Sequence, residues 1–157
     1  MSERIQLKAG DAAPAFSAPG LDGEPVTLES FAGRSLVLYF YPKDNTAGCT
    51  LEAQGFRDHL ADFEALGYAV AGVSRDSVKS HCGFRDRQNL NFPLLADKEE
   101  VVCTAYGVMK EKMMYGRLCR GIERSTFVIS PEGRILHALY GVKAKTHVEE
   151  LLALLKA

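Results

Sequence analysis

The stretch 35-SLVLYFYPKDNTAGCTLEAQGF-56 contains the change of pattern that decides the fold. Its first part, residues 35–41, is a run of aliphatic and aromatic residues, which is typical of a buried strand. Pro42 then ends the strand, because it has no N–H group to donate to a sheet. Thr46 has the side chain of a helix N-cap, and a helical pattern follows it. The stretch therefore predicts a strand that leads directly into a helix.

The pattern continues in the same manner along the chain. Apolar residues at helical spacing follow Thr46, and the stripe they form consists of Phe56, Leu60, Phe63 and Leu66. Further strands are expected at 68–74, 125–130 and 134–141, with a shorter one at 92–97. Further helices are expected near 77–88 and 99–106 and at 146–156. Strands and helices that alternate in this order predict an α/β fold with a central mixed β-sheet flanked by helices.

Three connecting segments complete the expected architecture. The turn 131-PEG-133 joins the last two strands as a hairpin. The turn-rich residues 11–33 are expected to add a small edge hairpin. Residues 109–114 are expected to form either a methionine-rich partner surface or a charged loop over the sheet, and residues 112–121 are expected to form a loop. Neither a repeat nor a linker interrupts the sequence, so residues 1–157 are predicted to form a single domain.

Composition excludes several classes of function. The 157 residues carry 19 basic and 20 acidic side chains, a balance that gives no reason to expect nucleic acid or an anionic membrane as a partner. The start, 1-MSERIQLKAGD-11, lacks the apolar segment of a secretory signal, so we expect a cytoplasmic protein. The four cysteines show neither C-x-x-C spacing nor a disulfide framework, and the histidines show no metal-ligand spacing. No metal site is expected.

Cys49 is the best candidate nucleophile, because it falls in the first turn of the predicted helix. The free N–H groups and the positive end of the helix dipole both favour a thiolate there. Gly48 leaves room for another group to approach the sulfur. The alternative is that Cys49 is only a small hydrophobic residue and Thr46 only a cap.

The motif 42-PKDNTAGC-49 matches the P-x-x-x-T-x-x-C signature of peroxiredoxins. The segments 8-KAGDAAPAFSAPGLDG-23, 39-YFYPKDNTAGCTLEAQGFRD-58 and 121-GIERSTFVISPEGRI-135 resemble the peroxiredoxin Q group, also called bacterioferritin comigratory proteins. The similarity covers nearly the whole chain in the same order. It is therefore far more specific than the motif alone.

This resemblance implies a thioredoxin-like fold and a thiol peroxidase that reduces hydrogen peroxide and organic hydroperoxides without a metal, flavin or haem. It makes Cys49 the peroxidatic cysteine and Thr46 the hydroxyl that orients the peroxide. It also makes Pro42 the shield of the pocket and Arg124 the guanidinium near the sulfur, where a positive charge suits the developing anion. From the residues alone, Arg124 could instead pair with a carboxylate such as Glu123 or Glu52.

The cysteine that resolves the sulfenic acid is less obvious, because the position that many members of the group use is Gln54 here. Cys82 is the strongest candidate. Helical spacing places it opposite the core-facing Phe84 and towards solvent, and Gly83 weakens the helix around it. Some members of the group place the resolving cysteine in this same helix, about one turn further on, near Arg85.

Two other thiols remain as alternatives. Cys103 lies in an apolar helical stretch and is expected to be buried and inert. Cys119 is expected in a loop between Arg117 and Arg120, which would favour its thiolate. An external thiol could also complete the reaction, as in a one-cysteine peroxidase.

The resemblance also implies a partner and an oligomeric state. Thioredoxin or a similar dithiol is the expected reductant, and the chain is expected to act as a monomer. The rivals are a thioredoxin-like disulfide oxidoreductase, disfavoured because Glu52 stands where C-x-x-C needs its second cysteine, and a redox sensor that uses Cys49 only as a switch.

Overall fold

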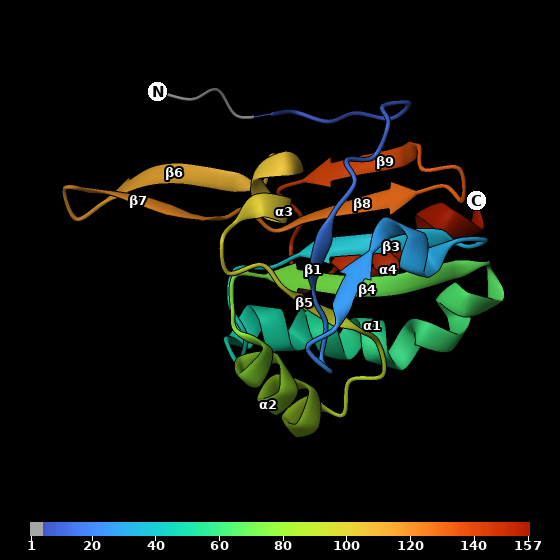
Figure 1. Ribbon diagram of the computed structural model, residues 1–157, viewed down its shortest axis with the longest axis horizontal. Coiled ribbons are helices and arrows are strands. Elements are labelled where there is room, and N and C mark those ends of the chain that lie inside the picture. The colour runs from blue at the N-terminus through green and yellow to red at the C-terminus, as the bar shows by residue number, and fades with distance from the viewer. Residues whose placement is uncertain (1–4) are drawn as a thin grey trace.

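The computed structural model describes residues 5–157 and contains a five-stranded mixed sheet between two layers of helices and loops (Figure 1). The sheet order is β5-β4-β3-β8-β9. Strands β3, β4 and β5 run parallel, β8 is antiparallel to β3, and β9 is antiparallel to β8. The sheet strands are β3 (Ser35–Phe40), β4 (Tyr68–Ser74), β5 (Leu94–Ala96), β8 (Ser125–Ile129) and β9 (Ile135–Tyr140). The predicted α/β architecture with a mixed sheet is therefore confirmed.

The helices also follow the predicted order. They are α1 (Ala47–Ala65), α2 (Val78–Gln88), α3 (Val101–Ala105) and α4 (His147–Lys156), with a short 3-10 helix η1 (Leu28–Phe31). The expected edge hairpin is present as β1 (Ser17–Pro19) and β2 (Pro25–Thr27), which pair with each other as a separate small sheet. No helix of the described residues is both long enough and apolar enough to cross a membrane.

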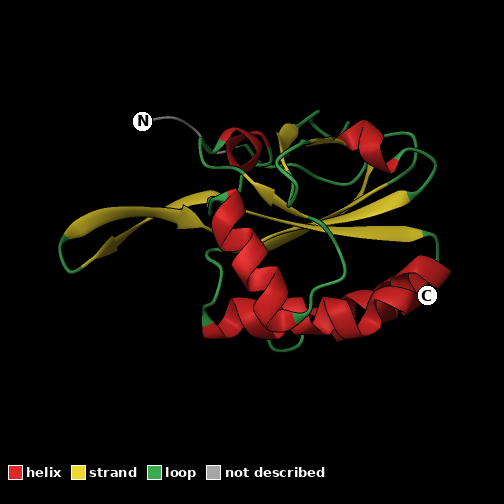
Figure 2. Ribbon diagram, turned by 60° about the horizontal axis from the view of Figure 1, so that its bottom comes forward, coloured by secondary structure: helices red, strands yellow, loops and turns green. Residues whose placement is uncertain are grey.

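Strand β3 lies at the centre of the sheet and contributes to both cores. Its side chains alternate between the two faces, as they do in any strand. Leu36, Leu38 and Phe40 pack into one core with α3 and the N-terminal hairpin. Val37 and Tyr39 pack into the other core, which α1, α2 and α4 cover (Figure 2). Burial on both faces explains why the strand reads as one continuous apolar run.

The stripe predicted on α1 is confirmed for its first three residues and wrong for Leu66. Phe56 and Phe63 are fully buried and Leu60 is buried, but Leu66 follows the end of the helix and remains exposed. The buried face extends instead in the other direction, through Ala53 to the start of the helix. The buried face therefore includes the turn that holds Cys49.

The prediction of a loop in residues 109–121 is wrong. This segment forms a hairpin of β6 (Met109–Met114) and β7 (Arg117–Ile122) that projects from the body of the molecule (Figure 1). Tyr115 and Gly116 make the turn, both with positive φ, as a two-residue hairpin turn of this hand requires. Tyrosine is an unusual residue there, and projecting strands have no core to impose alternation. Both sequence signals of a hairpin were therefore missing.

Candidate functional site

The candidate site forms where β3 leads into α1. Asn45 has a left-handed backbone, Thr46 returns to an extended conformation, and α1 begins at Ala47, so Cys49 is the third residue of the helix. Cys49 is 2% exposed. Thr46 occupies the predicted N-cap position, but its hydroxyl donates to the Lys43 carbonyl at 2.8 Å and makes no cap bond. The first turn of α1 thus keeps N–H groups that no capping side chain occupies.

Arg124, just before β8, brings a positive charge to Cys49. Its Nη2 lies 3.5 Å from Cys49 Sγ, and its Nη1 donates to Glu52 Oε1 at 2.6 Å. The sequence left open whether Arg124 contacts Cys49 or a carboxylate such as Glu52. It contacts both, because Glu52 lies one helical turn after Cys49. A side chain at Gly48 would place its Cβ 3.2 Å from Nη2. Gly48 therefore leaves the room that the guanidinium needs.

Glu52 is a fully buried carboxyl, although the sequence had suggested it only as a possible partner of Arg124. Burial raises its pKa to about 7, against the opposing effect of Arg124. Among the described residues, neither Glu52 Oε2 nor the buried Tyr39 hydroxyl has a hydrogen-bond partner. Burial, with the nearby Glu52 and Cys49, also raises the pKa of Tyr39. The inner side of the site is thus poorly solvated and holds a carboxyl that can titrate near neutrality.

Pro42 faces a cavity of about 440 Å³ that separates the end of β3 from the projecting hairpin. The wall opposite Pro42 consists of Lys110, Cys119, Arg120, Gly121, Ile122 and Glu123. Cys119 lies on β7 and is half-buried, so its expected loop position was wrong. Its neighbour Arg120 pairs with Glu100. Cys119 therefore shares a cavity with Pro42, in the loop that joins β3 to α1, although Arg120 is already engaged.

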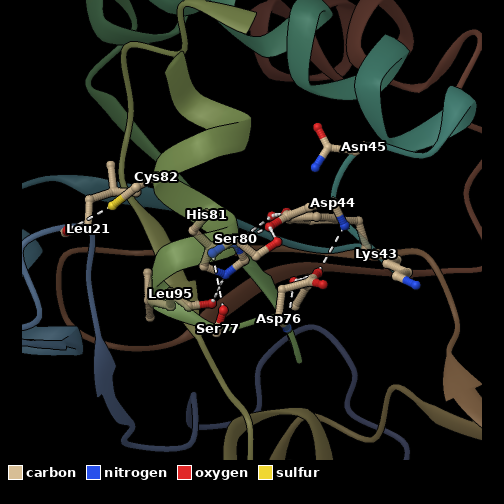
Figure 3. Close-up of polar contacts among 12 residues, drawn as sticks. Leu21, Lys43, Asp44, Asn45, Asp76, Ser77, Ser80, His81, Cys82 and Leu95 are labelled. Atoms are coloured by element: carbon tan, nitrogen blue, oxygen red, sulfur yellow. Dashed lines mark hydrogen bonds and ion pairs between the residues drawn. The ribbon is translucent and has the colours of Figure 1, made fainter. Parts of the chain in front are cut away.

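Cys82 lies in α2 and is less accessible than predicted. Phe84 is fully buried as expected, but Cys82 is half-buried rather than turned to solvent. Its thiol donates to the Leu21 carbonyl at 3.2 Å, in the connection between β1 and β2 (Figure 3). Helical spacing correctly placed Cys82 away from Phe84, but could not show that a distant loop covers it. All four cysteines are free thiols in this structure.

Cys103 is fully buried, as predicted. Burial raises the pKa of its thiol well above the ordinary value, and the Asp97 carboxylate beside it acts in the same direction. A thiol in these surroundings is a poor nucleophile.

A second polar cluster lies between α2 and the loop that joins β3 to α1. Asp44 and His81 are buried, with Asp44 Oδ2 and His81 Nδ1 2.7 Å apart (Figure 3). With Asp76 they form a group whose donor atoms lie close enough together to hold a metal ion. The carboxylates are already satisfied by protein donors, since Asp44 accepts from Tyr41 and Asp76 accepts from the Asp44 backbone. The residues present therefore fit a hydrogen-bonded cluster better than a metal site.

Comparison with known proteins agrees with the fold. The family model described as the AhpC/TSA family matches residues 9–138. Peroxiredoxin Bcp of Xanthomonas campestris is 50% identical over 135 residues, which cover 86% of this chain and 84% of the relative. Peroxiredoxin Bcp of Escherichia coli is 41% identical over 150 residues, 96% of each chain.

Solved structures show the same relationship. A structure of the bacterioferritin comigratory protein of Xanthomonas campestris, from work on its alkyl peroxide reduction activity, matches with a TM-score of 0.87 and 44% identity, covering 93% of this chain and 98% of the other. A cysteine-to-serine variant of the Xylella fastidiosa peroxiredoxin Q matches with a TM-score of 0.90 and 42% identity, covering 97% of both. The chain therefore belongs to the AhpC/TSA family, in its peroxiredoxin Q group.

Membership of this family establishes the fold and the class of enzyme. The fold is thioredoxin-like, as the sequence predicted. The protein is a peroxidase of the oxidoreductase class, which takes a hydroperoxide as substrate and needs a reductant to complete its cycle.

Proposed function

We propose that this chain reduces hydrogen peroxide and organic hydroperoxides with Cys49 as the peroxidatic thiolate. The contact that carries the proposal is the 3.5 Å approach of Arg124 Nη2 to Cys49 Sγ in the first turn of α1. The guanidinium is positively charged at every physiological pH, so it stabilises negative charge on the sulfur and on the departing oxygen. The alkyl peroxide activity named for the Xanthomonas campestris relative supports the organic substrates.

In the first step the Cys49 thiolate attacks the nearer oxygen of the hydroperoxide. The S–O bond forms as the O–O bond breaks, Cys49 becomes a sulfenic acid, and the second oxygen leaves as hydroxide or alkoxide and is then protonated. The Thr46 hydroxyl donates to Lys43, so its lone pairs are available to accept from the peroxide O–H. Pro42 lines the neighbouring cavity, and in this proposal its ring shields the sulfur. In these roles Thr46 and Pro42 position the substrate and Arg124 stabilises charge.

In the second step Cys82 resolves the sulfenic acid. Its thiolate attacks Cys49 Sγ, the S–S bond forms as the S–O bond breaks, and the sulfenic oxygen leaves as hydroxide, which is then protonated to water. A disulfide needs Cα atoms within about 7 Å, so the turns that hold the two cysteines must first unwind. Thioredoxin or a similar dithiol then reduces the disulfide to two thiols and is itself oxidised. The proposed enzyme is a cytoplasmic, single-domain monomer without a cofactor.

The test is intact mass and non-reducing peptide mapping of the reduced protein after one equivalent of hydrogen peroxide. Loss of two hydrogens with a Cys49–Cys82 cross-linked peptide is expected. A Cys49–Cys119 peptide would assign resolution to the hairpin, and oxygen addition confined to Cys49 would assign it to an external thiol. A Cys49 that does not react would overturn the proposed function.

Turnover separates a peroxidase from a redox sensor. A sensor is oxidised once per chain, whereas the proposed enzyme consumes many equivalents of peroxide when thioredoxin and its reductase are supplied. A Cys82→Ser variant with dithiothreitol as reductant is the matched control, because Cys49 oxidation and reduction by an external thiol do not require Cys82.

A further inference from the structure

Three consecutive residues fasten one turn of α2 to three other parts of the molecule. Ser80 Oγ donates at 2.8 Å to Oδ2 of Asp44, which lies in the loop between β3 and α1 (residues 41–46), called the catalytic loop below. His81 Nε2 lies 2.9 Å from the Leu95 carbonyl in β5, and its Nδ1 contacts Asp44. Cys82 donates to the Leu21 carbonyl. Figure 3 shows Ser80 and His81 directed towards Asp44, and Cys82 directed to the other side, towards Leu21.

The bond between His81 and Asp44 is the most buried of these attachments. The His81 side chain and the Asp44 side chain are each 1% exposed. Because a carbonyl can only accept, His81 Nε2 donates to Leu95, and Nδ1 faces the Asp44 carboxylate. Burial alone would raise the pKa of Asp44, but the hydrogen bonds and charge of His81, with the Tyr41 and Ser80 hydroxyls, outweigh it and lower that pKa. The carboxylate is therefore ionised, and its bond to His81 is charge-assisted.

Asp44 and His81 differ in how many other hydrogen bonds fix the segments that carry them. Asp44 keeps other attachments, since the Tyr41 hydroxyl donates to its Oδ1 at 2.6 Å and its own backbone N–H donates to Asp76 at 2.9 Å. The first turns of α2 depend on the bonds described above, with the Ser77 cap, which accepts from the Ser80 N–H. Removing the bond from the His81 side would therefore loosen α2 more than the catalytic loop.

We propose that His81 is a positioning residue that acts through Asp44 to hold the Cys82 turn in α2, and so sets how fast Cys82 can leave the helix to reach Cys49. The consequence for Cys49 rests on the proposed function. The bond to Asp44 must break before the turn unwinds, because it ties His81, the residue next to Cys82, to a segment outside α2. Peroxide attack itself does not require this motion.

The first experiment measures the reactivity of Cys82 without any disulfide chemistry. Reduced protein with Cys49→Ser is alkylated with iodoacetamide, and the rate at Cys82 is read by peptide mass. His81→Gln places an amide nitrogen near Nε2 and keeps a donor to Leu95, whereas His81→Asn places it near Nδ1 and keeps the donor to Asp44. We expect His81→Gln to raise the Cys82 rate about tenfold, as loss of one bond to a charged group would, and His81→Asn to stay near the parent protein.

Two results would overturn the proposal. One is an unchanged Cys82 rate in His81→Gln. The other is an equal increase in both variants, which would assign the effect to the lost packing of the imidazole ring. If His81→Gln does not fold, Asp44→Asn tests the same bond from the loop side with a nearly isosteric change. His147→Gln is the control for loss of a buried histidine elsewhere, because His147 bonds Thr126 in β8 and should leave the Cys82 rate unchanged.

The second experiment separates the two steps of the proposed cycle in protein that retains Cys49. The chain has no tryptophan, so the reaction with one equivalent of peroxide is stopped by rapid acid quench and followed by mass. In His81→Gln the rate of Cys49 oxidation should equal that of wild type, and disulfide formation should be about tenfold faster. An equal change in both steps would contradict a positioning role. If the wild type forms no Cys49–Cys82 disulfide, the resolving step of the proposed function fails, and the alkylation rates still decide the role of the Asp44–His81 bond.

Discussion

The starts of α1 and α3 present the same residue in the same place with opposite surroundings. Cys49 is the third residue of α1 and Cys103 is the third residue of α3, and their exposures are 2% and 0%. In α3 the Asp97 carboxylate accepts from the backbone N–H groups of Val102 and Cys103, at 3.1 and 2.8 Å. The start of α3 favours a negative charge, and the Asp97 carboxylate already supplies it.

In α1 no capping side chain takes that place, and a cation lies beside the sulfur instead. The Thr46 hydroxyl is turned to Lys43, and Arg124 contacts Cys49 Sγ. Burial and helix position are thus shared by the two thiols, while the charge next to the sulfur differs in sign. The comparison teaches that the neighbouring charged group, rather than burial or helical position, separates a candidate nucleophile from an inert core residue.

The largest expected effect comes from replacing each of these two cysteines in turn. Cys49→Ser should reduce peroxide consumption to the uncatalysed rate, because a serine hydroxyl is a far weaker nucleophile than a thiolate. Cys103→Ala should keep most of the activity and lose only the stability of a small buried side chain. Peroxide consumption with dithiothreitol, per folded protein, measures both. Equal losses in the two variants would break the comparison.

The next effect concerns the charge beside each sulfur. Arg124→Gln should slow Cys49 oxidation by about 10²- to 10³-fold, the range for loss of one donor to a developing anion. The matched control is Arg75→Gln, which removes an arginine from the other region, where it pairs with Glu100 at 3.0 Å. The rate of Cys49 oxidation by one equivalent of peroxide, followed by quench and mass, should be unchanged in that control. A loss below about tenfold in Arg124→Gln would show that the guanidinium does not act on the sulfur.

Glu52 should make stability depend on pH in a direction opposite to that of most carboxyls. Its pKa in the folded protein is raised to about 7 from the ordinary 4.5, so between these values the folded chain binds more protons than the unfolded chain. Stability must then fall as pH rises from 4.5 to 7, by about 3 kcal/mol for this group. Glu52→Gln keeps the shape and removes the titration. Denaturant unfolding at pH 5 and pH 7.5 should show the variant losing less stability than wild type.

A second buried group titrates in the same range, so the wild-type curve alone is not sufficient. Burial lowers the pKa of His147 to about 4, and the unfolded chain therefore binds more protons between 4 and 6.5. Stability rises with pH through that window, against the effect of Glu52. The difference between wild type and Glu52→Gln cancels the contribution of His147. A difference that does not change between pH 5 and pH 7.5 would contradict the raised pKa of Glu52.

Sequence predicted most of the fold because its main elements carry local signals. The apolar run of β3, the break at Pro42 and the helical spacing after Thr46 are all readable without knowledge of the rest of the chain. The β6–β7 hairpin was missed because its turn is Tyr115–Gly116 and its strands project from the core. Neither the turn residues nor an alternation of apolar and polar residues therefore marked this hairpin in the sequence.

The candidate site was predictable in part for a similar reason. The position of Cys49 follows from its own helix, whereas the contacts of Arg124 and Cys82 depend on residues far away in the chain. Arg124 reaches across 75 positions to Cys49, and Cys82 is covered by Leu21, 61 positions away. Nothing near Asp44 indicated that it would meet His81. Sequence can therefore propose which residues react, but the groups that position and cover them require the folded structure.

The smallest expected effect concerns a third thiol, Cys82. Unlike Cys49 and Cys103, it lies in the interior of its helix rather than in the first turn. Glycine at position 83 weakens α2 next to Cys82, by about 0.5–1 kcal/mol relative to alanine. Gly83→Ala should therefore slow formation of the Cys49–Cys82 disulfide about two- to fivefold, because unwinding becomes more costly. The added Cβ lies 3.0 Å from Arg87 Nη2, the end of a flexible side chain that can shift.

The rate of Cys49 oxidation in the same quench experiment is the internal control and should not change in Gly83→Ala, since Gly83 lies in α2 and outside the Cys49 turn. Faster disulfide formation, or an unchanged rate, would mean that unwinding of α2 does not limit the resolving step. Cys82 would then be controlled in the same way as Cys49 and Cys103, by the groups that touch its sulfur, rather than by the stability of the helix that carries it.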